Sequence, residues 1–238
     1  MKIFANNQVY RFKNIGYLIF GFLLVSVGIA LAADGADIKK GDVTVDGLTV
    51  MKANRMTEIQ IKNEVDWSEY TKYQLTPVEV SFRRDWKRDY NRKRRVVSAW
   101  VTDKDMARIK ETLAKIVYEE FDSALQKKGG LIKVDEADSN TLLFKPVIIN
   151  LDVYAPDIQT SSMTRAYIRQ AGRGTLFLEI YDAVSGEILA RWVDTREDPD
   201  RGYLDWANRI TNINRATIVV RSWAKRLVEG MDQLKAIN

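Results

Sequence analysis

The residues with the most distinctive chemistry lie in one short segment, positions 83–95. It contains eight basic and two acidic residues, and both its arginines and its two aromatic residues recur at intervals of four. On a helix, this spacing would place a basic stripe beside an aromatic one. Such a face could bind phosphates or other anions, with the rings stacking on the ligand or anchoring the chain at a membrane interface. The predicted anion-binding residues are Arg84, Lys87, Arg88, Arg92, Lys93, Arg94, Arg95, Trp86 and Tyr90.

A second interpretation of the same segment requires no ligand. Asp89 lies four residues before Lys93, and Asp85 lies close to Arg84 and Arg88 in the sequence. Pairs at these spacings attract each other on a helix surface. The segment could therefore be a solvated helix that neutralises part of its own charge.

Carboxylates near a predicted hairpin offer the alternative of catalysis. Glu179, Asp182, Glu187 and Asp194 lie on its strands or at its ends. Two carboxyl groups at a suitable separation could hydrolyse a glycoside, so a carboxylate-dependent hydrolase acting on envelope glycans is the alternative function. The simpler interpretation is that these are solvated strand and turn residues, since Asp182 is a residue type that begins turns.

A further acidic group, Glu197, Asp198 and Asp200, could supply oxygen ligands to calcium. Its spacing does not match a calcium-binding EF-hand loop, which needs alternating acids, a central glycine and a terminal glutamate. We therefore interpret it as an acidic loop before a helix.

The chain has neither histidine nor cysteine. Triads based on serine or cysteine with histidine, conventional zinc sites, haem ligation by these residues and thiol redox chemistry are therefore excluded. The sequence also lacks a phosphate-binding P-loop and a dinucleotide-binding glycine motif. We expect no cofactor, no metal site and no enzymatic activity.

Two amphipathic helices are expected to support these residues. The first spans about 103–128: Thr102 and Asp105 resemble a capping box, and apolar residues follow at helical spacing. The second spans about 212–235. Lysines and glycines at 127–130 are typical of a helix C-terminus.

Alternating apolar residues predict strands at 78–82, 131–134 and 142–154, and two hairpins at 43–50 and 175–193. Pro146 should bend the long strand or place it at a sheet edge. The expected fold is α+β: a single domain with a mixed or mainly antiparallel sheet and two long helices packed on one face.

The first 32 residues have the layout of a secretory signal peptide. Three basic residues precede an apolar run at 15–31, and small residues follow. We expect cleavage between Ala32 and Ala33, which leaves residues 33–238 as a single periplasmic domain. The alternative is retention as an anchor, because residues 15–33 are nearly long enough to span a bilayer.

Removal of this leader changes the charge balance. The whole chain carries a net charge of +5, and the leader accounts for three positive charges and no acid. The positive charge of the remaining domain is therefore concentrated in segment 83–95. Export argues against nucleic acid as a ligand. The expected partners are an envelope protein or an anionic envelope component, namely a lipid headgroup, lipopolysaccharide or a glycan.

The order and spacing of several short segments resemble family 3313 of domains of unknown function, exported proteins of Gram-negative bacteria that are often lipoproteins. The resembling segments are residues 46–48, 67–70, 78–82, 174–179, 182–190 and 222–224. Lipoprotein members have a cysteine at the cleavage site, whereas this chain has alanine. The resemblance implies an envelope protein and assigns no catalytic residue.

Overall fold

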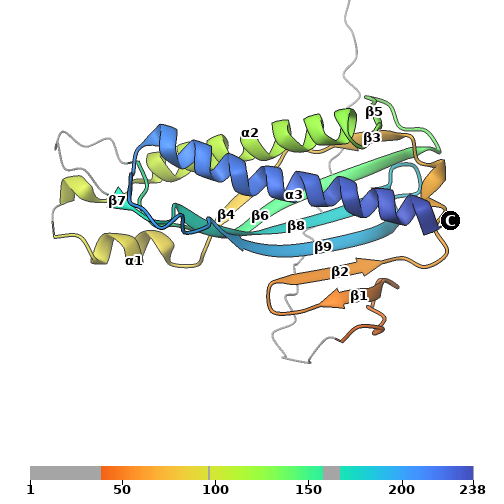
Figure 1. Cartoon of the computed structure of the whole chain (residues 1–238), viewed down its shortest axis with the longest axis horizontal. Helices are drawn as coiled ribbons and strands as arrows, with labels where there is room; N and C mark the ends of the chain where they lie inside the picture. The colour runs from red at the N-terminus through yellow and green to blue at the C-terminus, as the bar shows by residue number, and fades with distance from the viewer. Residues whose placement is uncertain (1–38, 96, 158–166, 238) are drawn as a thin grey trace, which may run out of the picture. The chain divides into compact units, whose positions relative to one another are not determined.

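The computed structural model describes residues 39–95, 97–157 and 167–237. The predicted signal peptide and its cleavage site between Ala32 and Ala33 lie outside the described residues. The described residues belong to one compact unit, whose buried apolar residues run from Leu48 to Met231. A mixed sheet forms one layer, and two long helices, α2 (Asp103–Lys127) and α3 (Arg209–Ile237), lie side by side on one face of it (Figure 1). The α+β architecture is as the sequence predicts.

Strands make up most of the remaining structure, and three short helical segments interrupt them. The helical segments are η1 (Trp67–Glu69), α1 (Trp86–Arg92) and η2 (Val97–Ala99). The strands are β1 (Thr49–Ala53), β2 (Thr57–Ile61), β3 (Lys72–Leu75), β4 (Glu79–Phe82), β5 (Ile132–Lys133), β6 (Thr141–Val153), β7 (Tyr167–Ile168), β8 (Gly172–Asp182), β9 (Ile188–Glu197) and β10 (Asp205–Trp206).

Within the described residues, the main sheet has eight strands in the order β1-β2-β9-β8-β6-β3-β5, with β4 also paired to β6. β6 contacts β8 along one side in antiparallel register. Its other side is shared by two parallel strands: β3 pairs with residues 141–144 and β4 with residues 147–151. β6 is therefore an interior strand that connects the two halves of the sheet.

Of the two effects predicted for Pro146, a bend or an edge position, the edge position is wrong, because β6 is paired on both sides. Phe144 pairs with Leu75 at the end of β3, and Val147 pairs with Glu79 at the start of β4. Pro146 therefore faces the gap between β3 and β4, where a missing N–H is tolerated. The strand is irregular farther on, where Asn150 adopts a φ of 53° within a register shift.

The helices form because each has an apolar face to bury. α2 starts at the predicted capping box: the Asp105 amide donates to Thr102 Oγ1 at 3.1 Å, and the Thr102 amide donates to Asp105 Oδ2 at 3.0 Å. Val117, Phe121 and Leu125 are fully buried one to two turns apart. The core also includes Trp223 and Met231 of α3, Phe144 and Ile148 of β6, and Leu176 and Leu178 of β8.

The N-terminal strands extend farther than expected. The hairpin predicted at 43–50 is present but short: Val43 bridges Thr49, the Thr44 amide donates to the Leu48 carbonyl oxygen, and the Val50 amide donates to the Asp42 carbonyl oxygen. β1 also pairs with β2, and β2 pairs with β9. Strand pairing is decided by the partner available in the sheet, and here β9 offers a long free edge that extends the ladder outward.

Candidate functional site

The predicted aromatic stripe is not a surface feature. Trp86 is only 2% exposed, and its ring is stacked between Phe82 at 4.3 Å and Tyr90 at 5.7 Å between ring centroids. Its indole Nε1 donates a hydrogen bond to the Val153 carbonyl oxygen at 3.3 Å. Trp86 therefore anchors α1 to the end of β6 and offers no face for stacking on a ligand.

Part of the basic charge is neutralised locally. Arg83 contacts Asp89 at 3.1 Å and Asp152 at 3.2 Å, so it connects α1 to β6. Hydrogen bonding from Arg83 holds the pKa of Asp89 below its ordinary value. Lys87 pairs with Asp103 at the start of α2. In the described part of the chain, the expected pair between Asp89 and Lys93 does not form, because Asp89 is already engaged.

Arg84 and Arg88 lie beside Asp85, as the sequence suggests. Arg88 approaches Asp85 at 3.2 Å and Arg84 does so at 3.9 Å. Asp85 has a φ of 60° and precedes the helix, so Arg84 lies outside α1 and its side chain is 97% exposed. The helical stripe predicted from Arg84, Arg88 and Arg92 is therefore wrong at its first position.

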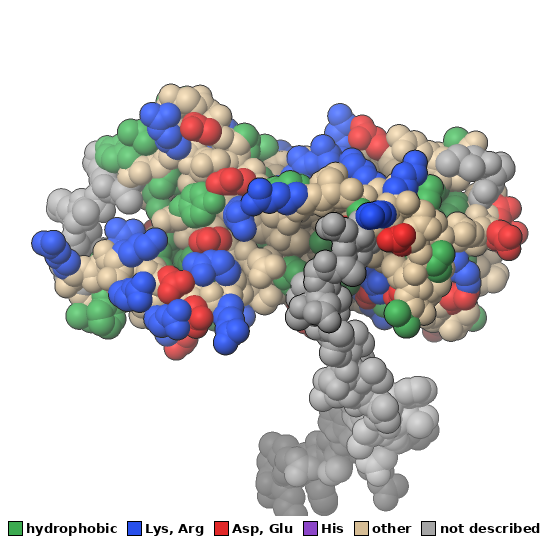
Figure 2. Space-filling model, turned by 90° about the horizontal axis from the view of Figure 1, so that it is seen from below, with side chains coloured by type: hydrophobic (Ala, Val, Ile, Leu, Met, Phe, Trp, Pro, Cys, Tyr) green, Lys and Arg blue, Asp and Glu red, His purple; other side chains and the backbone are tan. Residues whose placement is uncertain are grey.

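The cations that remain unpaired lie at the C-terminal end of α1. Arg92, Lys93 and Arg95 are exposed and have no ion pair among the described residues. Arg94 lies over the Tyr90 ring at 4.7 Å and donates to its hydroxyl oxygen. We call the exposed set the basic surface, and Figure 2 shows Lys and Arg side chains gathered on this side of the molecule. It consists of Arg84, Arg88, Arg92, Lys93, Arg94 and Arg95.

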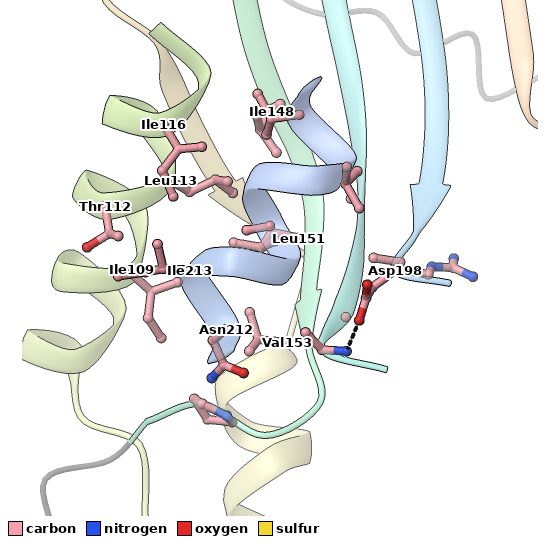
Figure 3. A pocket seen from close by; sticks show the side chains of 18 of the residues that line it. Ile109, Thr112, Leu113, Ile116, Ile148, Leu151, Val153, Asp198, Asn212 and Ile213 are labelled. Carbon is pink, nitrogen blue, oxygen red and sulfur yellow. Dashed lines mark hydrogen bonds between the residues drawn. The ribbon is translucent and has the colours of Figure 1, made fainter. Parts of the chain in front are cut away.

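An apolar cavity lies between the two long helices and the sheet, close to the N-terminal ends of both helices (Figure 3). Its volume is about 150 Å³. Ile109 and Leu113 of α2, Ile213 of α3, and Ile148 and Leu151 of β6 form its apolar walls. The fully buried apolar residues of α2 begin farther along the helix, at Val117.

A buried charged cluster borders this cavity. Asp198 follows β9 and is 3% exposed, and its Oδ2 accepts the Ala171 amide at 2.8 Å and Arg215 Nη1 at 2.7 Å. Arg215, 1% exposed, also contacts Asp205 at 2.5 Å. Burial lowers the pKa of Arg215, but its bonds to these two carboxylates outweigh that effect and raise it. The guanidinium is therefore charged at every accessible pH.

Residues 198–200 lie in a loop before α3, as interpreted from the sequence, but the individual acids are engaged and one of them is buried. Glu197 ends β9 and accepts a hydrogen bond from the Tyr154 hydroxyl at 2.5 Å. Asp198 is buried against Arg215, and Asp200 lies 3.8 Å from Arg169. Among the described residues, no group of three or more acids is arranged to hold a metal ion.

The hairpin carboxylates have structural partners. Glu179 accepts bonds from Tyr181 and Arg191, and the Asp194 carboxylate is buried against Thr57, Arg196 and Trp223. These two side chains do not line the apolar cavity, whose acidic lining residues in the described chain are Asp157 and Asp198.

The other two hairpin carboxylates lie near the turn. Glu187 pairs with Lys62. Asp182 accepts bonds from Tyr70 and Ser185. Neither side chain lines the cavity. None of the four hairpin carboxylates therefore faces another acid across this cavity, so this predicted set gives the hydrolase alternative no support.

Sequence reasoning missed the cavity because no local pattern marks it. Its lining is drawn from α2, β6, β8, the end of β9 and α3, over residues 108–223. Each apolar contributor has the spacing of an ordinary core residue. The buried Arg215 was a potential clue, because a charged residue within an apolar helix face is rarely left unpaired.

Comparisons with curated protein sequences and with solved structures say little about this chain. No curated protein sequence matches the chain. A PelC dodecamer from Paraburkholderia phytofirmans is similar in structure with a TM-score of 0.34 and 10% identity, covering 69% of this chain and 93% of that one. A PDZ domain protein from Parabacteroides distasonis ATCC 8503 has a TM-score of 0.35 and 13% identity, covering 69% of this chain and 33% of that one.

The family comparison covers most of the chain. A family described as "Protein of unknown function (DUF3313)" matches residues 51–227. The matched region begins within β1 and ends within α3, so it includes nearly the whole sheet, all of α2 and the first 19 of the 29 residues of α3. The chain therefore belongs to the DUF3313 family of proteins of unknown function.

Proposed function

We propose that this chain is an exported, non-enzymatic periplasmic protein that binds an anionic component of the cell envelope through the basic surface. The observation that carries the proposal is the run of exposed, unpaired cations Arg92, Lys93 and Arg95 at the end of α1. Anionic lipid headgroups are the component that fits best, for reasons of charge and of neighbouring apolar groups. The hydrolase alternative has no comparable observation in its favour.

Charge provides the first part of this reasoning. Each Lys or Arg close to an anionic lipid surface contributes about 1 kcal/mol of attraction. The nearby acids Asp85 and Asp89 are engaged by Arg88 and Arg83. The cations at 92, 93 and 95 therefore remain available to phosphate groups.

Exposed apolar side chains provide the second part. Trp100 is 42% exposed, and its Nε1 donates to the Arg94 carbonyl oxygen at 3.3 Å, which keeps the ring next to the basic surface. Val97 of η2 is also exposed. Tryptophan favours the level of the headgroups at a membrane surface, so cations and an apolar anchor would contact the same bilayer.

The periplasmic location rests on the leader at residues 1–32 and remains part of the proposal. Among the described helices, none combines the length and apolarity required to cross a bilayer. The described core lies entirely within 39–237, so a chain starting at Ala33 is a suitable reagent that lacks the apolar run.

The test is sedimentation of this chain with vesicles of phosphatidylglycerol and phosphatidylethanolamine, compared with vesicles of phosphatidylcholine. We expect binding to the anionic vesicles that weakens with added salt. The triple variant Arg92→Gln, Lys93→Gln, Arg95→Gln should bind roughly 100-fold more weakly.

A matched variant controls for net charge. The control variant Lys127→Gln, Lys128→Gln, Arg226→Gln removes three exposed cations. Two of them lie at the C-terminal end of α2, and Arg226 lies in the second half of α3. We expect this control to retain nearly all binding. Equal losses in the two variants, or equal binding to both kinds of vesicle, would contradict the proposal. Binding to lipopolysaccharide without binding to phosphatidylglycerol would redirect it to a glycolipid.

A further inference from the structure

We infer that the cavity between α2, α3 and the sheet is a binding site for a small uncharged molecule that has an apolar body and a hydroxyl or amide N–H group. This site is distinct from the basic surface and does not depend on the proposed function. Three features of the cavity support it: its size, its unpartnered oxygens and the charges of its lining.

The size fits one ring or a short chain. The cavity of about 150 Å³ is comparable to cavities in proteins that hold a benzene-sized molecule. Ile109, Leu113, Ile148, Leu151 and Ile213 line it (Figure 3). Burying an apolar group against such walls is favourable by about 25 cal/mol per Å² of surface removed from water.

Two buried oxygens that border the cavity accept no hydrogen bond from the described residues. Asp198 uses Oδ2 for both of its bonds, to Ala171 and Arg215, and Oδ1 has no partner. Asn212 donates through Nδ2 to the Ala155 carbonyl at 3.0 Å, and its Oδ1 also has no partner. Buried acceptors are normally satisfied, and leaving one without a donor is costly. Both oxygens therefore call for a ligand that donates.

The charges of the lining favour an uncharged donor. Arg108, Arg173, Arg196 and Arg209 all line the cavity and would oppose an ammonium group. A ligand carboxylate would lie beside the carboxylates of Asp157 and Asp198, and two of the four arginines, Arg108 and Arg196, are already paired with acids. A hydroxyl or amide N–H satisfies the acceptors and avoids both penalties.

Four probes that share a benzene ring distinguish an apolar, a hydroxyl-bearing, a cationic and an anionic ligand. They are toluene, benzyl alcohol, benzylamine and benzoate. The indole N–H resonance of Trp223 provides a local readout, because Trp223 lines the cavity and donates to Asp194 Oδ2 at 2.9 Å. The chain has six tryptophans, so a Trp223→Phe variant identifies the resonance. Titration of the chain starting at Ala33 should shift this resonance, with benzyl alcohol binding roughly tenfold more tightly than toluene.

A filled cavity provides the second test. Ala216 lines the cavity on α3, so Ala216→Leu places apolar atoms in the space while keeping a strong helix former. We expect benzyl alcohol binding to fall at least tenfold. Asn214→Leu adds the same side chain at an exposed position of α3 outside the cavity lining and should leave binding unchanged.

Each alternative outcome is informative. No shift of the Trp223 resonance with any probe at millimolar concentration would overturn the site, as would unchanged binding in Ala216→Leu. Equal binding of toluene and benzyl alcohol would overturn the role of the two oxygens. Tightest binding by benzylamine or benzoate would overturn the assignment of an uncharged ligand.

Discussion

Replacing Arg215 with methionine tests how the buried charges are balanced. The guanidinium holds Asp198 at 2.7 Å and Asp205 at 2.5 Å, and it also donates to the Arg169 carbonyl oxygen at 2.8 Å. Methionine preserves much of the side-chain volume but removes the charge and all of these donors. Asp198, 3% exposed, would then be a buried carboxylate whose only remaining donor among the described residues is the Ala171 amide.

The expected cost follows from this geometry. Removing one partner of a buried ion pair destabilises a protein by about 3–5 kcal/mol. Asp205 retains 30% of its side-chain exposure and can recover water, so its share is small. We therefore expect Arg215→Met to lower the free energy of unfolding by about 4 kcal/mol, most of it through Asp198.

The assay is urea unfolding followed by circular dichroism for the wild type, Arg215→Met, Asp198→Asn and the double variant. If the two side chains stabilise each other, the double variant should be about 2 kcal/mol more stable than the sum of the single effects predicts. Arg221→Met removes an exposed ion pair with Glu120 and should leave the midpoint nearly unchanged. A cost below about 1 kcal/mol for Arg215→Met, or additive effects in the cycle, would refute the reasoning.

Three further changes test individual parts of the fold. Thr102→Ala removes the cap of α2 and should cost about 1 kcal/mol in urea unfolding, whereas Thr102→Ser should cost much less. Gly172→Ala places a Cβ atom 2.3 Å from the Asp152 carbonyl oxygen and should lower stability by about 2 kcal/mol; an unchanged unfolding midpoint would contradict this contact. Burial raises the pKa of Asp182, but bonds from Ser185 and Tyr70 outweigh it and hold the pKa below 3.8. The stabilisation by this carboxylate is therefore present above about pH 3.8 and lost as the pH falls through the lowered pKa, so the stability difference between the wild type and Asp182→Asn should be constant from pH 7 to about pH 5 and should shrink below about pH 4; a difference independent of pH would contradict this assignment.

The sequence was most informative where local pattern and final environment agree. α2 was predicted almost to its ends, because Thr102 and Asp105 begin it and a single apolar stripe is buried. The β8–β9 hairpin was also predicted, since residues such as Leu178 and Ile180 alternate with half-buried neighbours. In both cases the nearest residues in the chain determine the structure.

The short strands could not be predicted in this way. β2 and β3 contain mixed polar residues, and they become strands because β9 and β6 offer them hydrogen-bonding edges. Trp86 was expected on a surface stripe, but α1 is short and turns this ring onto Phe82 and the end of β6. The cavity depends on elements that only the tertiary structure brings together. Contacts between distant segments leave no periodic mark in a sequence.

The pairing of β3 and β4 with the same side of β6 has a consequence for the folding pathway. β8 and β9 follow β6 in the chain and can join it by closing comparatively short loops. β3 and β4 cannot do so, since Lys72 meets Thr141 and Glu79 meets Val147 across about 70 residues that include all of α2. The antiparallel meander should therefore form early, and docking of the N-terminal strands should limit the rate. During synthesis from the N-terminus, β3 can pair only with the short strand β5 before β6 has been made, and β4 remains without its partner strand until then.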